Sequence, residues 1–210
     1  MKQNLYGGKF VVFEGLNGSG KSEQARLLKE HLDKCGWATL LTKEPTQWTE
    51  AGQKIKEALE GKMNLVPLQL QELFAQDRAE HLRKEIIPAL REGKTVISDR
   101  YAFSSIAFGA LGVSFRVLFK LNEDFICPDK IFLLETSPEE CLRRIAKRGT
   151  KIRIFEELEK MHRIANSYKR LAHFEPFENF FIVIDGEKSI EEIHQEVINQ
   201  SRALKEKMLS

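Results

Sequence analysis

The sequence lacks long apolar runs. Unbroken apolar stretches, such as residues 10–13 and 131–134, are far shorter than the roughly 18 residues of a membrane-spanning helix. The first four residues lead through two glycines into an apparent strand and not into an apolar segment, so we expect no signal peptide. We therefore expect a cytoplasmic protein that makes no use of a membrane.

Cysteine and histidine are also scarce. Cys35, Cys127 and Cys141 are odd in number and far apart, so they indicate neither a disulfide framework nor a zinc site. The histidines lack the spacing of metal ligands, and we expect them at surface positions. They are His31, His81, His162, His173 and His194. A reducing compartment suits this pattern best.

Neither sign of charge dominates the chain. Lys and Arg total 33 against 31 for Asp and Glu, which gives a net charge of +2, and 42% of the 210 residues are apolar. This balance indicates a soluble chain and points to no particular partner. The length suits a single domain over residues 1–210. Composition thus excludes several classes of protein and selects no function.

The sequence does contain a regular alternation of strand-like and helix-like segments. Short runs rich in β-branched and aromatic residues lie at 9–14, 37–42, 94–99, 130–135 and 180–185. Such runs without polar alternation are typical of parallel strands buried on both faces. The alternation predicts an α/β domain with a three-layer, doubly wound parallel sheet of about five strands.

The segments between these runs have helical spacing. Apolar residues recur at 25, 28 and 32, and a longer pattern predicts a helix from Phe155 to Leu171. Ser189 stands three residues before Glu192, which predicts a capping box at the start of a C-terminal helix. The longer pattern consists of Phe155, Leu158, Met161, Ala165, Tyr168 and Leu171.

A glycine-rich motif follows the first strand-like run and matches GxxxxGK[ST]. Its glycines let backbone N–H groups converge on phosphate, Lys21 can reach the β and γ oxygens, and the Ser22 hydroxyl can ligate Mg²⁺. A turn that merely joins strand to helix is the alternative, but it would require neither side chain. The motif therefore predicts an ATP-binding P-loop. Its residues are Gly15, Leu16, Asn17, Gly18, Ser19, Gly20, Lys21 and Ser22.

Asp99 and Arg100 close the third strand-like run. The Asp99 carboxylate is the type of group that Mg²⁺ or its waters need in a P-loop fold. An aspartate that ends a strand is often only a turn or helix cap. Arg100 beside it favours the functional interpretation, because ligands collect at the carboxyl ends of parallel strands.

Together these motifs resemble the thymidylate kinase family of P-loop nucleoside-monophosphate kinases, over essentially the whole chain. The resemblance is strongest at residues 99–101 and at the pair Phe74 and Arg78. It implies P-loop NTPase topology, a mobile lid at about residues 143–155, ATP with Mg²⁺, and a homodimer with a helix such as residues 70–82 at its interface. It extends to Phe13-Glu14-Gly15, Lys43-Glu44-Pro45, Ser104, Ala107, Pro128-Asp129, Arg144 and residues 147–149.

The resemblance also implies an acceptor site. Phe74 would stack on thymine, and Arg78, one helical turn later, would donate to a carbonyl of the base. Arg100 would hold the monophosphate with help from Lys43, where the family more often has arginine. Core packing is the alternative for the aromatic residues. The remaining implied contacts are Ser105 near the base, Phe108 against the sugar and Asn17 near a sugar hydroxyl.

A basic segment follows the fourth strand-like run and resembles the family's lid. The resemblance implies that Arg144 and Arg153 act on the transferring phosphate, with Lys21 and Asp99, and that Arg148 lies along adenine. Some members place an arginine inside the P-loop, whereas this chain has Gly18 there, so the lid should supply it. A solvated, charge-laced helix face is the alternative. The segment contains Arg143, Arg144, Lys147, Arg148, Lys151 and Arg153.

Three residues depart from the family pattern. Asn17 stands where an acid is usual, Glu23 where threonine is common, and Gly109 where glutamine is common. None of them replaces a phosphate-binding or metal-binding residue. We therefore expect the chemistry to survive and acceptor affinity or selectivity to change.

The leading hypothesis is transfer of the γ-phosphoryl group of ATP to dTMP with Mg²⁺. A deoxynucleoside kinase, or a nucleoside-monophosphate kinase with another acceptor, is the main alternative; Arg100 and Lys43 argue against the former because a hydroxyl acceptor needs no phosphate site. A non-catalytic nucleotide-binding or nucleic-acid-binding protein fits less well, because residues 143–153 contain no aromatic side chain. We expect small nucleotides and no nucleic acid as partners.

Overall fold

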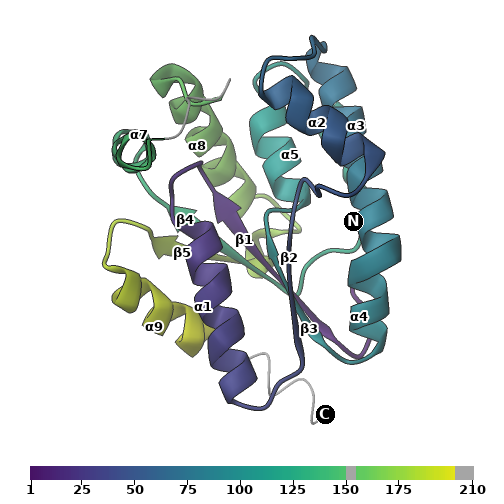
Figure 1. The fold of residues 1–210 in the computed structure, drawn as a ribbon, viewed down its shortest axis with the longest axis vertical. Helices are drawn as coiled ribbons and strands as arrows, with labels where there is room; N and C mark the ends of the chain where they lie inside the picture. The colour runs from purple at the N-terminus through teal and green to yellow at the C-terminus, as the bar shows by residue number, and fades with distance from the viewer. Residues whose placement is uncertain (150–154, 202–210) are drawn as a thin grey trace.

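The computed structural model describes residues 1–149 and 155–201, over which strands and helices alternate (Figure 1). Within these ranges, we find no helix with the length and apolar character needed to cross a membrane. The strands are β1 Lys9–Gly15, β2 Thr39–Lys43, β3 Thr95–Asp99, β4 Lys130–Glu135 and β5 Phe181–Asp185. The helices are α1 Lys21–Lys34, α2 Glu50–Leu59, α3 Pro67–His81, η1 Leu82–Ile86, α4 Ile87–Arg91, α5 Ala102–Gly109, α6 Phe115–Asn122, α7 Pro138–Lys147, α8 Leu158–Ala172, η2 Glu178–Phe180 and α9 Ile190–Ser201.

Among the described residues, the strands form one parallel sheet in the order β2-β3-β1-β4-β5. This confirms the predicted doubly wound α/β fold. Because β3 and β4 flank β1 on opposite sides, the sheet has its switch point beside the P-loop, where such folds bind ligands. β2 begins two residues later than predicted, because the Trp37 N–H donates to the Leu32 carbonyl and so closes the end of α1.

Alternate side chains of β1 enter two separate apolar layers. Val11 and Phe13 pack with α1 and α9, whereas Phe10 and Val12 pack with η1 and α4. All four side chains are fully buried. Figure 1 shows α1 and α9 beside each other along the sheet, with α4 on the other side. Burial on both faces is the reason that this strand is apolar without alternation.

Two predicted helical features are confirmed at opposite ends of the chain. In α1, Ala25, Leu28 and Leu32 form the buried face. Before α9, the Ser189 hydroxyl accepts a hydrogen bond from the Glu192 N–H at 3.2 Å, and the Glu192 carboxylate accepts one from the Ser189 N–H at 2.9 Å. This reciprocal pair is the predicted capping box.

The helix predicted to begin at Phe155 begins at Leu158, so the predicted start is wrong by three residues. Glu157 is the N-cap with extended backbone, and the Phe155 ring packs against Phe108 with 5.3 Å between ring centroids. Phe155 therefore matched the helical spacing by coincidence, and Leu158 at the helix start is 43% exposed. The buried residues of α8 are Met161, Ile164, Tyr168, Leu171 and Ala172.

Candidate functional site

The P-loop, the ends of β2 and β3, and helices α2, α3 and α5 surround a cleft with a volume of about 430 Å³. It lies at the carboxyl end of the sheet, next to the switch point. Residues 150–154, which include Arg153, lie outside the described residues. The predicted site residues that line the cleft are Asn17, Gly18, Lys21, Ser22, Lys43, Phe74, Arg78, Asp99, Arg100, Ser105, Phe108 and Arg148. Four P-loop residues, Gly15, Leu16, Ser19 and Gly20, do not line this cleft, and neither does Arg144.

Lys21 folds back over the P-loop. Its ammonium group donates to the Leu16 carbonyl at 2.6 Å and lies 3.3 Å from the Ser19 hydroxyl. Burial, followed by the positive charge of Arg100, lowers the pKa of Lys21 to about 7, although Asp99 and Glu14 oppose this. A group whose charge is disfavoured in this way gains most from an anion placed beside it. An anion placed beside Lys21 would therefore stabilise its charged form.

Gly18 could not carry a side chain in this loop. Its φ is +85°, and a Cβ atom would lie only 2.6 Å from the Cys141 carbonyl of α7. The close approach of α7 to the P-loop therefore requires glycine. An arginine at this position would therefore need a different packing of α7.

Ser22 and Asp99 meet at the start of α1. The Ser22 hydroxyl donates to Oδ2 of Asp99. Oδ1 of Asp99 is buried and has no hydrogen-bond partner among the described residues. A hydroxyl and a carboxylate with an unused buried oxygen are the hard donors that Mg²⁺ prefers. The pair therefore fits the predicted metal site, with Ser22 and Asp99 as the residues that would hold the ion directly or through water.

Arg100 is held over the P-loop in an unusual backbone conformation. Its φ of 77° lies in the left-handed region, which costs a non-glycine residue free energy. One terminal nitrogen donates to the Gly15 carbonyl at 3.0 Å and to the Ser104 hydroxyl at 2.9 Å, and the other donates to Oδ1 of Asn17 at 2.6 Å. The guanidinium also lies over the Phe108 ring, 5.0 Å from its centroid. These contacts aim the guanidinium at the cleft.

Glu14 lies fully buried beneath Arg100 and had no role in the sequence-based prediction. One carboxylate oxygen accepts hydrogen bonds from the backbone N–H groups of Tyr101 and Ser104, at 3.0 and 3.1 Å. The other accepts from the hydroxyls of Ser104 and Tyr168. Burial raises the pKa of Glu14, against the charge of Arg100 and these hydroxyl donors. The available signal was a carboxylate at the end of an otherwise apolar strand.

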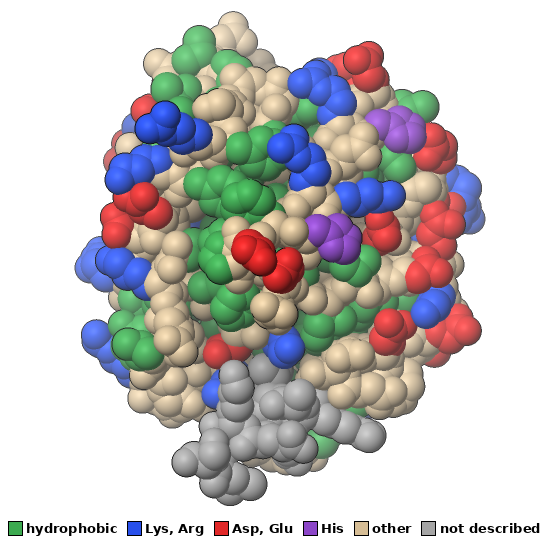
Figure 2. Space-filling model, turned by 180° about the vertical axis from the view of Figure 1, so that it is seen from behind, with side chains coloured by type: hydrophobic (Ala, Val, Ile, Leu, Met, Phe, Trp, Pro, Cys, Tyr) green, Lys and Arg blue, Asp and Glu red, His purple; other side chains and the backbone are tan. Residues whose placement is uncertain are grey.

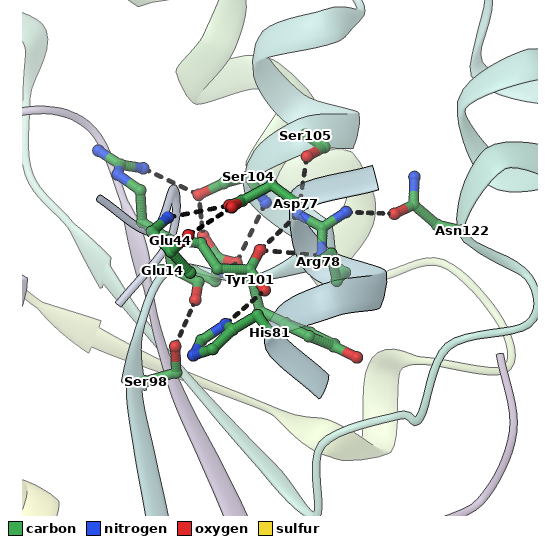
Figure 3. A network of polar contacts seen from close by, with 12 residues as sticks. Glu14, Glu44, Asp77, Arg78, His81, Ser98, Tyr101, Ser104, Ser105 and Asn122 are labelled. Atoms are coloured by element: carbon green, nitrogen blue, oxygen red, sulfur yellow. Dashed lines mark hydrogen bonds and ion pairs between the residues drawn. The ribbon is translucent and has the colours of Figure 1, made fainter. Parts of the chain in front are cut away.

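Arg78 anchors a second buried network at the far side of the cleft (Figure 3). Its Nε donates to the Glu44 carboxylate at 2.9 Å, Nη1 to Asn122 at 2.6 Å, and Nη2 to Ser105 at 2.9 Å. Nη2 also lies 2.7 Å from Glu44. With the described residues, these contacts engage four of the five guanidinium N–H groups and leave one on Nη1.

His81 completes this network, and its expected surface position is wrong. The imidazole is fully buried, with Nδ1 3.2 Å from Glu44 and Nε2 2.9 Å from Glu85. The Thr42 hydroxyl lies 2.7 Å from Nε2 and donates to Glu85. Burial alone would lower the pKa of His81, but the hydrogen bond to Glu44 and the charges of Glu44 and Glu85 raise it overall.

We expect this histidine to stabilise the fold most at low pH. Its pKa is raised, so its stabilisation is fully present below the unfolded value of about 6.5 and is lost as the pH rises through the folded value. The free energy of unfolding of the native chain should therefore exceed that of His81→Gln by more at pH 6 than at pH 9. Urea denaturation at both values measures this difference; a difference that does not change with pH would contradict the assignment.

Aromatic and polar side chains form the remaining walls. Phe74 and Phe108 face the cleft from α3 and α5, and Phe155 lies against Phe108. Asn17 donates to the Glu156 carboxylate at 2.9 Å. An aspartate at position 17 would place two carboxylates side by side. The asparagine found here, which departs from the family pattern, instead offers Glu156 a hydrogen-bond donor. The sequence analysis assigned no role to Glu156, although its position beside a basic segment was a usable signal.

Gly109, another departure from the family pattern, lies in a closely packed position. A Cβ atom there would lie 2.8 Å from Cδ of Gln71 on α3 and 2.6 Å from Cδ2 of Leu118 on α6. A side chain at position 109 would therefore require the ends of the Gln71 and Leu118 side chains to move. The Gln71 amide itself is buried, and its Oε1 has no partner among the described residues.

The described basic residues of the predicted lid take different positions. Arg144 donates to Glu140 at 2.7 Å and to the Gly186 carbonyl at 3.0 Å, and lies 3.5 Å from the Ser19 carbonyl. Arg148, at the C-cap of α7, lines the cleft that also contains Lys21 and Asp99. Arg144 therefore links the P-loop to the end of β5, whereas Arg148 borders the cleft.

Comparisons with known proteins agree over most of the chain. The family model described as thymidylate kinase matches residues 13–197. A probable thymidylate kinase of Pyrococcus abyssi is 40% identical over 198 residues, which cover 91% of this chain and 94% of that protein. One from Thermococcus gammatolerans is 38% identical, with 91% and 94% covered. A thymidylate kinase of Leptospira borgpetersenii is 35% identical, with 90% and 91% covered.

Proposed function

This chain belongs to the thymidylate kinase family, and we propose that it transfers the γ-phosphoryl group of ATP to dTMP, giving dTDP and ADP. One observation carries the proposal for this chain. A single cleft is lined by a P-loop lysine, by Phe74 and Arg78, and by Arg100. Such a cleft offers one anion site for each of two phosphorylated substrates.

The acceptor would bind with its base between α3 and α5. Phe74 supplies a ring face for thymine, and the remaining N–H on Nη1 of Arg78 can donate to a base carbonyl. Ser105, which already accepts from Arg78, keeps that guanidinium in place. Arg100 would grip the monophosphate as a fork, with Lys43 as an exposed point charge at the end of β2. Phe108 would lie against the sugar, opposite Asn17.

The donor would bind along the P-loop. Backbone N–H groups of residues 15–20 and the N-terminus of α1 favour the phosphates, and Lys21 would contact the β and γ oxygens. Ser22 and Asp99 would hold Mg²⁺, which neutralises charge on the phosphates when it is bound. Transfer would require no covalent intermediate, because positioning and charge stabilisation suffice for this chemistry.

We propose roles for the lid arginines that follow from the contacts they make. Arg148 borders the cleft, so we assign it to the transferring phosphate. Arg144 bridges Ser19 and Gly186 and is assigned to the adenine side, which exchanges the two roles that the family resemblance implied. Arg153 stays a candidate for phosphate contact from the sequence alone.

The chain is further proposed to act as a cytoplasmic homodimer with a lid at about residues 143–155.

The decisive experiment is an acceptor panel with ATP and Mg²⁺. ADP release should be fastest with dTMP, when dTMP, dUMP, dCMP and thymidine are compared at equal concentration. Turnover of thymidine without turnover of dTMP would instead establish a deoxynucleoside kinase. Preference for dCMP would establish another monophosphate acceptor and overturn the role of Arg78 and Phe74 in base recognition.

A nucleic-acid-binding protein is the weaker candidate. Basic and acidic side chains are interspersed over the described part of the face shown in Figure 2, without a stripe of basic residues there. Duplex binding that falls steeply with salt, together with no ADP release on any acceptor, would be needed to support it.

A further inference from the structure

Two buried hydroxyls join Arg100 to Glu14. The Tyr168 hydroxyl donates to Glu14 at 2.9 Å, lies 2.9 Å from the Ser104 hydroxyl, and lies 3.4 Å from a terminal nitrogen of Arg100. The Ser104 hydroxyl also donates to Glu14 and accepts from Arg100 at 2.9 Å. Tyr168 is 2% exposed and Glu14 is fully buried. Water therefore has little access to replace these contacts.

The directions of the hydrogen bonds follow from the carboxylate. Glu14 accepts four hydrogen bonds, two from backbone N–H groups and two from hydroxyls, which is the pattern of an ionised, acceptor-only group. Each hydroxyl has one proton, and both protons point at Glu14. The Ser104 oxygen is thereby left to accept from Nη1 of Arg100, whose second N–H goes to the Gly15 carbonyl. Tyr168 lies 3.4 Å from the same nitrogen and holds the Ser104 hydroxyl through their shared acceptor, Glu14.

We propose that Tyr168 and Glu14 are positioning residues that hold Arg100 in the orientation needed to grip the acceptor monophosphate. Glu14 orients the two hydroxyls, and the hydroxyls orient the guanidinium. The inference rests on the proposed function, in which Arg100 binds that phosphate. Because Tyr168 lies on α8, the helix after the lid segment, it also ties this helix to the acceptor site.

The left-handed backbone of Arg100 makes such support necessary. A strained residue keeps its conformation only where its surroundings hold it in place. The Arg100 N–H donates to the Phe13 carbonyl at 3.0 Å, and its carbonyl accepts from the Ser98 hydroxyl at 2.7 Å, so the backbone is fixed by β1 and β3. The side chain depends on Gly15, Asn17, Ser104 and Tyr168.

The chain offers a matched control for Tyr168. Tyr101 is also a fully buried tyrosine, but its hydroxyl has no hydrogen-bond partner among the described residues. Substitution by phenylalanine removes one buried hydroxyl at either position and keeps the ring. Any difference between Tyr168→Phe and Tyr101→Phe in acceptor binding therefore reports the contacts to Glu14 and Arg100.

The test compares the binding of dTMP and thymidine by calorimetry, together with steady-state kinetics. Tyr168→Phe should weaken dTMP binding and raise its KM by about tenfold. Thymidine has no phosphate for Arg100, so its binding should stay within about twofold, as should KM for ATP. Tyr101→Phe should match the native chain in all of these measurements. A purely structural role of Tyr168 would weaken both ligands alike.

Glu14→Gln provides a second, independent variant. The amide of glutamine can donate a proton, so one hydroxyl would turn toward Arg100 instead of away from it. The loss of dTMP binding should exceed that of Tyr168→Phe, again without loss of thymidine binding. Equal dTMP binding by Tyr168→Phe and Tyr101→Phe would overturn the inference. Failure of the native chain to phosphorylate dTMP would overturn the proposed function instead, and the two outcomes are distinguishable.

Discussion

Replacing Lys21 by alanine is expected to lower kcat for dTMP phosphorylation by about 10³-fold, or about 4 kcal/mol. The ammonium group lies in the cleft with the Ser22 and Asp99 pair, where charge on the transferring phosphoryl group would be stabilised. Alanine removes that charge and leaves the backbone N–H groups of the loop in place. ATP binding should therefore weaken less than turnover falls. Coupled ADP release and calorimetric ATP titration measure the two effects.

Stability separates this loss of chemistry from loss of the fold. The pKa of Lys21 is lowered to about 7 in the folded chain, whereas in the unfolded chain it is about 10.4. At any pH below about 10.4 the native fold therefore disfavours the charged form of this lysine. Removal of the lysine should thus leave Tm unchanged or raise it near pH 7.5. Lys34→Ala, at the exposed end of the same helix, is the matched control and should keep full activity. Retention of more than a tenth of kcat by Lys21→Ala would contradict its role.

The layers of the fold could be predicted because their signals are local. A strand buried on both faces, such as β1, is apolar throughout, and a helix on its surface repeats apolar residues every three or four positions, as α1 does. The P-loop pattern is equally local, because its glycines, its lysine and its serine all lie within residues 15–22. Failures occurred where a side chain left its element's pattern, as with Phe155, which turns to the Phe108 ring before α8 begins.

The buried polar networks could not be predicted, because their partners are distant in the sequence. Glu14 meets Tyr168 across 154 positions, and His81 meets Glu44 across 37. The sequence around a single histidine or glutamate does not reveal such a distant partner, and glutamate is in general mostly exposed in folded proteins. Arg78 was identified only through the family resemblance. The guanidinium of Arg78 is buried, and its ion pair with Glu44 explains how this charge is tolerated there.

Replacing Arg78 by leucine is expected to impair both stability and acceptor binding. Glu44 is 6% exposed and would lose its arginine partner and keep only His81, so the free energy of unfolding should fall by about 3 kcal/mol. The KM for dTMP should rise more than tenfold because a base carbonyl loses its donor, while KM for ATP stays constant. Urea denaturation and kinetics measure these effects, and Arg83→Leu, at an exposed position on η1, serves as the control.

Adding Glu44→Gln to Arg78→Leu separates the structural role of the pair from substrate recognition. With the carboxylate neutralised, no unpaired charge is buried, so the double variant should be more stable than the sum of the two single effects by about 1.5 to 3 kcal/mol. Its dTMP affinity should not recover, because glutamine at position 44 cannot replace the donor that Arg78 offers to the base. Recovery of dTMP affinity along with stability would show that Arg78 only neutralises Glu44 and does not contact the acceptor.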